Sequence, residues 1–497
     1  MENKIQKTFW LTVLVTFAVK VMLAAAIPLI SDEAYFVIWA KHLDFGYYDH
    51  PPMVAWFLKL MMFFGSSEVV LRMPAILTSL LIGIGIYYLL RKMNPAKAAL
   101  TATLFLISPI NLLYIPVSTD TPIILFAFVS ALFMYLAVEK DRYGYYLLSG
   151  MFLGLAFLSK YFAVLLGFSY LIYYLSTPKT KKRTFGLILL FIACAPFIFV
   201  NLYWNYTHSW ANFLFNMVNR NQKESLSLGK VFIYLISQAY LITPPLLYYA
   251  FRKRGYLLNK LSWSFSHKVF AFSFIIPLAV FLLLSAKKVI GLHWVLAFYP
   301  FMYIPVYYIL TEEDIINSIK FMLVFSLIHL FVLGALLSIP LEKFRDNRNY
   351  NMIVMGMKPQ SVIRQLLPYR QEFSLSTESY AESAVISYYS GRYFFVFGGG
   401  SHHGRQDDMI TDFRQLNDGN ILILRKAAPE IKNYLPYFKR VEVKEFTAHE
   451  AVFYTVLGYG FKYEVYKDTV LKGIKDNYYK IPSWLPCKTD YFSQKYF

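Results

Sequence analysis

Long apolar runs with few charged residues recur along the first 340 residues, and they constrain the fold of this chain more than any other feature. A run of about 20 such residues can cross the hydrocarbon core of a bilayer, where a helix is the simplest way to satisfy the backbone. Runs of this kind lie at 9–30, 69–90, 97–116, 121–138, 143–159, 161–176, 184–204, 230–251, 268–285, 289–310 and 321–340. The sequence therefore predicts a polytopic α-helical membrane protein with about 11 transmembrane helices. The short runs 143–159 and 161–176 form two spans, a re-entrant pair or a single broken element, and this choice gives a range of about 11 to 13.

Composition excludes an ordinary soluble enzyme and explains the basic charge. Charged residues make up 16% of the chain, against roughly 25% in soluble proteins. The formal net charge of +19 is carried by short clusters between apolar runs, which is typical of cytoplasmic loops. We therefore expect no nucleic-acid partner. The basic clusters at 91–97, 140–142, 179–183 and 252–260 are expected on the cytoplasmic side, and an odd number of spans places the C-terminal segment on the outer side.

A second, soluble domain is expected after the last apolar run. From Leu341 the sequence becomes polar and loses its periodicity. Segments 393–397, 420–424 and 441–446 are rich in β-branched and aromatic residues, as strands are. Helices are expected at 377–383 and 428–437, with a helix that runs into a strand over 383–390. The sequence thus predicts a transmembrane domain over 1–340 and a small α/β domain over 341–497.

The first apolar run is followed at once by ionisable residues, in SDEAYFVIWAKHLDFGYYDHPPMVAW at 31–56. We expect a short interfacial helix over 33–43, a turn at Gly46, and a second helix after Pro51 and Pro52. Asp32 and Glu33 at the end of a span can be partly desolvated, and one of them can then act as a base. The alternative is that both are solvated interfacial charges.

The other acid in this stretch is Asp49, which precedes His50 and the rigid Pro-Pro pair. A carboxylate and an imidazole fixed in this way can bind a phosphate or a divalent metal ion. A simple surface turn is the alternative.

Further polar residues stand near the ends of other apolar runs. Asp120 either caps a membrane helix or orients a substrate. Arg72 and Lys160 either extend to the interface or meet the phosphate of a lipid-linked ligand, and Lys288 lies in a basic, aromatic outer loop of the same kind. His208, in WNYTHSW, is either an interfacial aromatic-belt residue or a metal ligand.

The 31–56 segment and six others occur in one order that resembles a known family. The others are VVLRMPAIL, PVSTDTPIILF, GLAFLSKY, WNYTHSWANF, LITPPLLYYA and GLHWVLAFYP, and together they cover most of residues 9–310. The sequence resembles the bacterial polyprenyl-phosphate-sugar glycosyltransferases of family 39. These are related to protein O-mannosyltransferases and to the lipid A aminoarabinose transferase, and they have the GT-C fold. The sequence HGRQDD at 403–408 is similar to the C-terminal region of some bacterial members.

This resemblance implies an inverting transfer of a sugar from an undecaprenyl-phosphate donor to a cell-envelope acceptor. The acceptor would be lipid A, another glycolipid, a glycan or a protein, on the periplasmic face of a bacterial inner membrane. By the resemblance, Asp32 is the general base or orients the acceptor with the support of Glu33, and Asp120 serves the acceptor side. The donor phosphate would be bound by His50, Arg72, Lys160 and Lys288.

A metal site is the point where the sequence departs from the family pattern. In the aminoarabinose-type enzymes the residue matching Asp49 takes part in metal binding, completed by a histidine beyond the WNYTHSW region. Here Asn216 and Asn219 stand in that region, with His208 upstream. The resemblance thus implies at most a divalent metal ion at Asp49 and His208, and no other cofactor. His50 replaces a lysine, which would make phosphate binding depend on pH.

Two other classes of function compete with the enzyme. A transporter or flippase of a lipid-linked sugar would carry ionisable residues at the membrane midplane and often an inverted repeat. The sequence instead groups its acids at one face and shows no repeat, which favours the enzyme. A catalytically silent scaffold is the third hypothesis, and the presence of Asp32, Glu33, Asp49 and Asp120 argues against it.

Overall fold

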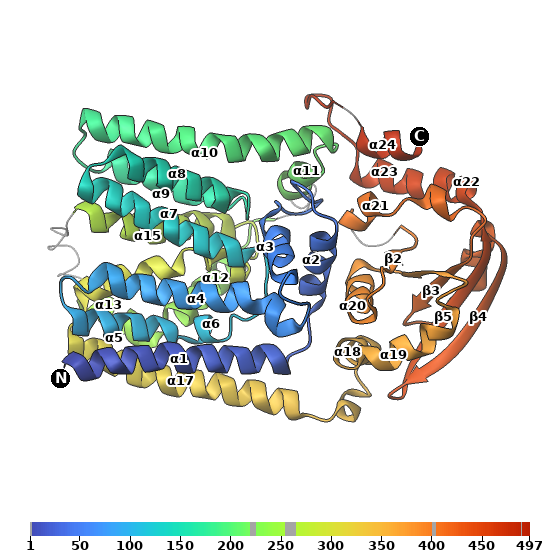
Figure 1. Ribbon diagram of the computed structural model, residues 1–497, viewed down its shortest axis with the longest axis horizontal. Coiled ribbons are helices and arrows are strands. Elements are labelled where there is room, and N and C mark those ends of the chain that lie inside the picture. The colour runs from blue at the N-terminus through green and yellow to red at the C-terminus, as the bar shows by residue number, and fades with distance from the viewer. Residues whose placement is uncertain (1, 219–224, 254–264, 400–403, 489) are drawn as a thin grey trace. The chain divides into compact units, whose positions relative to one another are not determined.

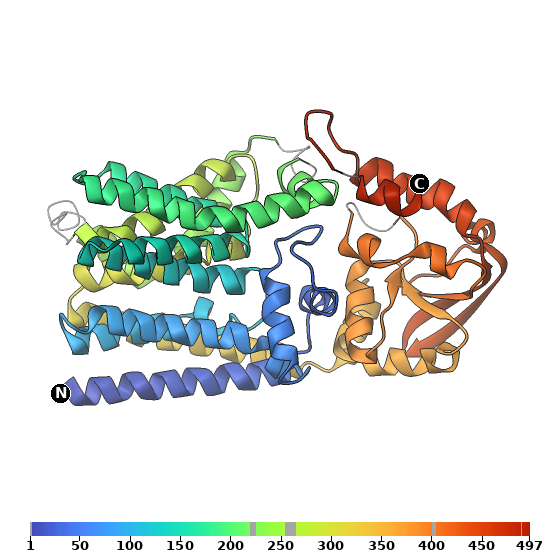
Figure 2. The ribbon, with the colours of Figure 1, turned by 45° about the horizontal axis from the view of Figure 1, so that its top comes forward.

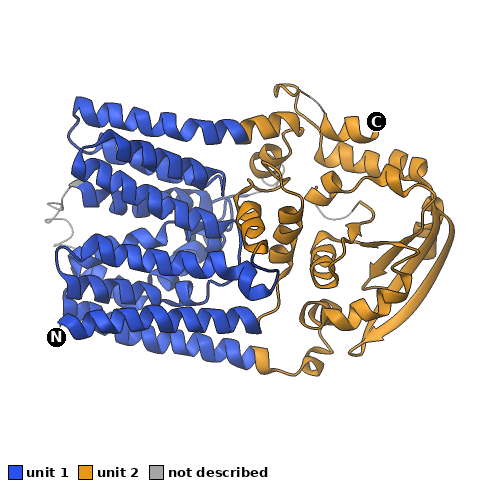
Figure 3. Ribbon diagram, viewed as in Figure 1, with its two compact units in different colours: residues 1–26, 64–200, 223–336 blue, residues 27–63, 201–222, 337–497 orange. Residues whose placement is uncertain are grey.

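The computed structural model describes residues 2–218, 225–253, 265–399, 404–488 and 490–497, and most of these residues are helical (Figure 1). Asn219 and His403 lie outside these ranges. The described chain forms two compact units (Figure 3), each built from several segments. Unit 1 comprises Met1–Ala26, Phe64–Val200 and Lys223–Leu336, and unit 2 comprises Ile27–Phe63, Asn201–Gln222 and Leu337–Phe497.

Unit 2 does not follow the linear boundary expected at residue 340. Segments 27–63 and 201–222, which the sequence analysis assigned to the transmembrane domain, pack with the C-terminal segment. The physical reason is a shared apolar core, in which Tyr48, Trp204 and Phe215 are buried together with Phe397 and Tyr466. Burial against a common core determines which segments form a unit, whatever their order in the chain.

Six described helices are long and apolar enough to cross a membrane. They are α1 (Glu2–Ala26), α4 (Glu68–Leu90), α7 (Asp120–Lys140), α10 (Lys181–Thr207), α15 (Phe265–Ser285) and α17 (Glu312–Ser338). Within unit 1, α1 packs on α4 and α5 (Pro95–Leu106), and α15 packs on α7 and α9 (Ala163–Leu175). These helices run side by side in both views (Figures 1 and 2). The prediction of a polytopic helical membrane protein is confirmed.

Several predicted spans are shorter or broken helices. Helix α5 ends before Pro109, which begins the single turn α6 (Pro109–Leu112). Helices α12 (Leu228–Ile242) and α13 (Pro244–Arg252) meet at 94°, because Pro244 and Pro245 cannot continue the hydrogen bonding of α12. Helices α8 (Tyr143–Phe157) and α9 are separate elements joined by the turn at 158–162.

The predicted span at 289–310 is wrong as a single helix. The structure has two 3₁₀ turns there, η2 (Leu292–Val295) and η3 (Tyr299–Met302), followed by α16 (Tyr303–Ile309). Pro300 lies inside this segment, and a proline there removes a backbone donor. Apolar composition alone did not predict the backbone of this segment, which the proline and the surrounding packing determine.

The helices of unit 2 are mostly short. They are α2 (Ser31–Lys41), α3 (Met53–Met62), α11 (Ala211–Met217), η4 (Leu341–Phe344), α18 (Tyr350–Met357), α19 (Pro359–Leu366), η5 (Leu367–Tyr369), α20 (Tyr380–Ser390), α21 (Gln406–Ile410), η6 (Phe413–Leu416), η7 (Ile431–Asn433), η8 (Leu435–Tyr437), α22 (Tyr463–Tyr466), η9 (Lys467–Leu471), α23 (Lys472–Tyr478) and α24 (Tyr491–Tyr496). The segment 383–390 is helical throughout, so the strand expected at its end is absent from α20.

A five-stranded sheet with the order β2-β1-β3-β5-β4 confirms the small C-terminal α/β domain. The strands are β1 (Ser374–Thr377), β2 (Phe395–Val396), β3 (Ile421–Arg425), β4 (Phe438–Ala448) and β5 (Ala451–Phe461). Strand β1 is parallel to β2 and β3, whereas β5 is antiparallel to β3 and β4. In β3, Ile421 and Ile423 enter one apolar core and Leu422 and Leu424 the other, because successive side chains of a strand point to opposite faces.

Candidate active site

Helix α2 presents one exposed and one buried carboxylate at its first turn. Glu33 is fully buried and accepts a hydrogen bond of 3.2 Å from the Ile30 N–H, which caps the helix. Asp32 keeps an exposed side chain, although surrounding protein atoms remove part of its water. This partial desolvation and the neighbouring charge of Glu33 raise the pKa of Asp32. Asp32 is therefore the carboxylate that a ligand can reach, and its raised pKa makes it a stronger base.

The turn after α2 is held rigidly by backbone and ring contacts. The Tyr47 N–H donates to the His50 carbonyl oxygen at 3.0 Å. The Tyr47 ring stacks on Trp39 with centroids 4.5 Å apart, and its hydroxyl donates to the Trp39 carbonyl oxygen at 3.1 Å. These contacts attach Asp49 and His50 to α2.

Helix α11 supports the same turn from the other side. The Asn212 side chain donates to the Tyr47 carbonyl oxygen at 2.8 Å, and the Asn216 side chain donates to the Asp49 carbonyl oxygen at 2.9 Å. Asn216 thus holds the Asp49 backbone by a neutral hydrogen bond. The amide N–H₂ group acts here as a hydrogen-bond donor.

Tyr380 lies near both acids of the motif. It is the first residue of α20, which packs against α2, and its ring centroid is 4.9 Å from that of Tyr35. Burial raises the pKa of Tyr380, and the negative charges of Asp32 and Asp49 raise it further. Tyr380 is therefore close enough to Asp32 and Asp49 to respond to their charges. The sequence did not predict Tyr380 as a site residue, because nothing near it in the chain signals that it lies close to Asp32.

His208 follows α10 and contacts Trp204 of that helix and Asp44 of the turn. Its Nδ1 lies 2.9 Å from the Trp204 carbonyl oxygen, which accepts a hydrogen bond from it, and its ring stacks on Trp204 at 4.4 Å. Its Nε2 is 3.8 Å from Asp44 Oδ2. Burial lowers the pKa of His208, although Asp44 opposes this shift. Among the residues the structure describes, no three His, Cys, Asp or Glu side chains are grouped to hold a metal ion.

Gly46 provides a first test of how tightly the turn is built. A Cβ added to Gly46 would lie 2.4 Å from the buried Trp204 ring. We expect Gly46→Ala to displace the turn and to lower activity about 10- to 100-fold, because small displacements of catalytic groups are costly. Steady-state turnover measures this. The matched control is Gly473→Ala, where a Cβ meets nothing within 4 Å, and equal losses in both variants would contradict the expectation.

Unit 1 contains a buried ion pair between two of the predicted site residues. Lys160, in the turn between α8 and α9, donates to Asp120 Oδ1 at 2.7 Å, and the two side chains are 10% and 5% exposed. Asp120 is the first residue of α7, and its own N–H donates to Ser118 Oγ at 3.1 Å. Ser118 is therefore the capping side chain, and the Asp120 carboxylate is engaged with Lys160.

The other predicted cations of unit 1 also make internal contacts. Arg72 is buried and donates to the Ala24 carbonyl oxygen at 2.9 Å. Lys288 Nζ lies 5.6 Å from the centre of the Trp294 ring. Lys20 of α1, which the sequence analysis did not select, is buried and donates to the Tyr114 carbonyl oxygen at 2.9 Å.

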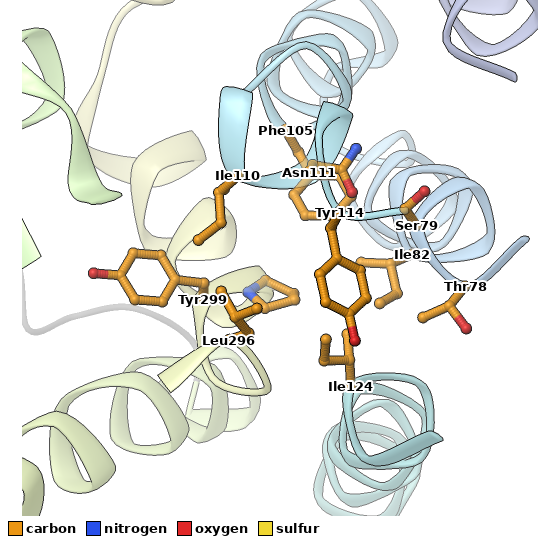
Figure 4. Close-up of a pocket in the computed structure, with 11 residues that line it drawn as sticks. Thr78, Ser79, Ile82, Phe105, Ile110, Asn111, Tyr114, Ile124, Leu296 and Tyr299 are labelled. Carbon is orange, nitrogen blue, oxygen red and sulfur yellow. The ribbon is translucent and has the colours of Figure 1, made fainter. Parts of the chain in front are cut away.

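A small cavity of about 40 Å³ lies inside unit 1 (Figure 4). Its lining is mainly apolar and consists of Thr78, Ser79, Ile82, Phe105, Ile110, Asn111, Tyr114, Ile124, Leu296, Tyr299 and Pro300. The Tyr114 hydroxyl bonds to Ser118 Oγ and Thr121 Oγ1 at 2.9 and 3.1 Å, which links one wall to the start of α7. Such a lining suits a hydrocarbon chain better than a sugar.

The chain is similar to known membrane glycosyltransferases in sequence and in fold. Residues 49–204 match the family model described as dolichyl-phosphate-mannose-protein mannosyltransferase. The chain is similar in fold to ArnT from Cupriavidus metallidurans, solved bound to undecaprenyl phosphate and in the apo state. In both cases the TM-score is 0.63 with 14% identity; 90% of this chain is covered, and 97% or 98% of ArnT. Together with the relative described next, these findings show that the chain is similar in sequence and fold to GT-C glycosyltransferases.

A curated relative points in the same direction. The chain is 25% identical over 205 residues to the lipid A galacturonosyltransferase RgtD of Rhizobium johnstonii. This match covers 40% of the chain and 42% of that relative.

Proposed function

We propose that this protein transfers a sugar from a polyprenyl-phosphate donor, of the undecaprenyl type, to a lipid or glycan of the cell envelope. The similarity to the lipid A galacturonosyltransferase RgtD favours a lipid A-type glycolipid as the acceptor. The similarity to ArnT, solved bound to undecaprenyl phosphate, favours a donor built on that lipid phosphate. We place the reaction on the periplasmic face of a bacterial inner membrane, because the basic clusters between the apolar runs favour the opposite, cytoplasmic side.

The observation that carries this proposal is the exposed Asp32 beside the buried Glu33. A hydroxyl acceptor needs a base, and Asp32 combines access with a raised pKa. The turn that carries Asp49 and His50 is fixed next to it by Tyr47 and Asn216, and fixed groups stabilise a developing charge better than mobile ones.

The proposed reaction is a direct displacement at the anomeric carbon. The acceptor oxygen forms a bond to that carbon while its proton passes to the Asp32 carboxylate. The bond from the anomeric carbon to the phosphate oxygen breaks, and the polyprenyl phosphate leaves with the electron pair. Displacement from the opposite face inverts the configuration of the sugar. No step requires a metal ion, and a divalent ion at Asp49 remains only an implication of the family.

Basic residues are proposed to stabilise the leaving phosphate. A phosphate monoester carries more charge than the diester donor, so cations near it bind the product side more strongly. The candidates are His50, Arg72, Lys160 and Lys288. We further propose that the cavity of unit 1 takes part of the polyprenyl chain, because its lining is mainly apolar.

The deciding experiment supplies the purified protein in detergent with a panel of undecaprenyl-phosphate sugars and total envelope lipid. Mass spectrometry should find a modified lipid and an equal amount of free undecaprenyl phosphate with at least one donor. If no donor is consumed, the transfer reaction is wrong. If a donor instead crosses liposomes unconsumed, the flippase hypothesis takes its place.

The pH dependence of transfer tests the base separately. Because the pKa of Asp32 is raised, the acidic limb of the kcat profile should lie at a higher pH than for an ordinary aspartate. Activity should rise as the pH increases through this limb, since the base must be ionised. Glu33→Gln keeps an acceptor for the Ile30 N–H and removes one source of the shift, so the limb should move to lower pH. A limb that stays in place would contradict the assignment of Asp32.

A further inference from the structure

Gln406, at the start of α21, joins the two segments that carry the candidate acids. Its backbone N–H donates to the Tyr35 hydroxyl at 2.7 Å, and its Oε1 accepts a hydrogen bond of 2.8 Å from the Tyr48 N–H. Tyr35 lies about one turn along α2 from Asp32, and Tyr48 directly precedes Asp49. Gln406 is only 4% exposed, so water cannot replace these hydrogen bonds without opening the site.

The segment that carries Gln406 is itself fixed. Arg405 forms an ion pair with Asp408 at 3.3 Å and donates to the Gly398 carbonyl oxygen at 3.1 Å. The Tyr393 hydroxyl donates to Asp407 Oδ1 at 3.0 Å. A side chain held on both sides in this way provides a stable point of attachment.

Close packing at the neighbouring glycine supports the same arrangement. A Cβ added to Gly404 would lie 2.6 Å from the Tyr48 ring, and this ring is fully buried. Gly404 therefore allows the backbone of the C-terminal domain to approach the turn closely. This is a reason for the sequence GRQDD at 404–408 that does not involve contact with a ligand.

We propose that Gln406 is a positioning residue for the transfer reaction. It sets the distance between Asp32 on α2 and Asp49 on the turn by holding Tyr35 and Tyr48 at once. The C-terminal domain then completes the active site rather than serving only as an attached soluble domain. This inference rests on the proposed function, because positioning is defined by its effect on the transfer.

The test compares Gln406→Met, which keeps the length and loses the acceptor, with Ser376→Ala as a matched control. Ser376 is buried in β1 of the same unit, and its hydroxyl donates to the Leu422 carbonyl oxygen at 2.8 Å. Each variant loses one buried side-chain hydrogen bond of the same length. Only Gln406→Met loses it next to the candidate acids.

Three measurements separate positioning from general stability: kcat and KM with the active donor, hydrogen exchange of a peptide covering 45–50, and thermal unfolding. Gln406→Met should lower kcat about 10- to 100-fold with little change in KM, and should speed exchange in that peptide. Ser376→Ala should lower the unfolding temperature by about as much as Gln406→Met does. It should leave kcat and the exchange of the 45–50 peptide unchanged. The double variant Gln406→Met with Tyr35→Phe should lose less kcat than the product of the fold-losses of the two single variants.

Several outcomes would overturn the inference. These are wild-type kcat in Gln406→Met, unchanged exchange at 45–50, or an equal loss of kcat in Ser376→Ala. Failure of the proposed function looks different, because the wild-type protein would then transfer no sugar from any donor. Faster exchange in Gln406→Met would in that case support the attachment of the turn and reject its role in transfer.

Discussion

Asp32→Asn is expected to abolish sugar transfer while the protein stays folded. Asn is nearly isosteric and cannot take the proton of the acceptor hydroxyl, and loss of a general base costs about 10²- to 10⁴-fold in rate. The exposed position of Asp32 means that removal of its charge should cost little stability. Transfer from the active donor and thermal unfolding in detergent measure the two effects.

The control for this experiment is Asp476→Asn, a change of the same kind at an exposed position of α23 in the same unit. It should leave transfer unchanged. If Asp32→Asn transfers sugar at the wild-type rate, the base must be another group. Asp49 would then be the next candidate for the base. The pKa of Tyr380 responds to the charges of both Asp32 and Asp49, so both carboxylates lie near it.

Lys160→Met is expected to cause the largest loss of stability among the predicted site variants. It leaves the Asp120 carboxylate buried without the cation that lies 2.7 Å away. Removal of one partner of a buried ion pair costs about 3–5 kcal/mol in free energy of unfolding. The double variant Asp120→Asn with Lys160→Met should recover most of this loss, because no charge then remains unbalanced.

Lys182→Met is the matched control for the ion pair. Lys182 pairs with Asp141 at 3.2 Å, but these side chains are 47% and 53% exposed, so its loss should cost less than about 1 kcal/mol. Unfolding in detergent compares all variants. Equal stability of Lys160→Met and Lys182→Met would contradict the burial argument.

The double variant also tests whether Lys160 serves the donor. If Lys160 binds the leaving phosphate, the double variant should be stable but should transfer sugar more slowly than the wild-type protein. If the pair only supports the fold, the double variant should transfer normally. Lys160 would then be removed from the phosphate-binding candidates, whereas Arg72 and Lys288 would stay.

Local sequence determined much of the active-site segment. The sequence predicted a helix over 33–43, and α2 begins two residues earlier, at Ser31. It ends at Lys41, two residues before the predicted end at 43. Pro51 and Pro52 predicted a new helix, and α3 begins at Met53. These features depend on residues within a few positions of one another, where capping and proline geometry act directly.

The sequence by itself thus determined the membrane class, the small α/β domain and the acidic segment at 31–50, because composition and short-range pattern specify them. Only the tertiary structure decided which residues share a site. Gln406 meets Tyr35 across 371 positions and Tyr48 across 358, and Lys160 meets Asp120 across 40. Such pairs arise when distant segments bury apolar surface together, and this packing leaves no signal in the residues adjacent to either partner.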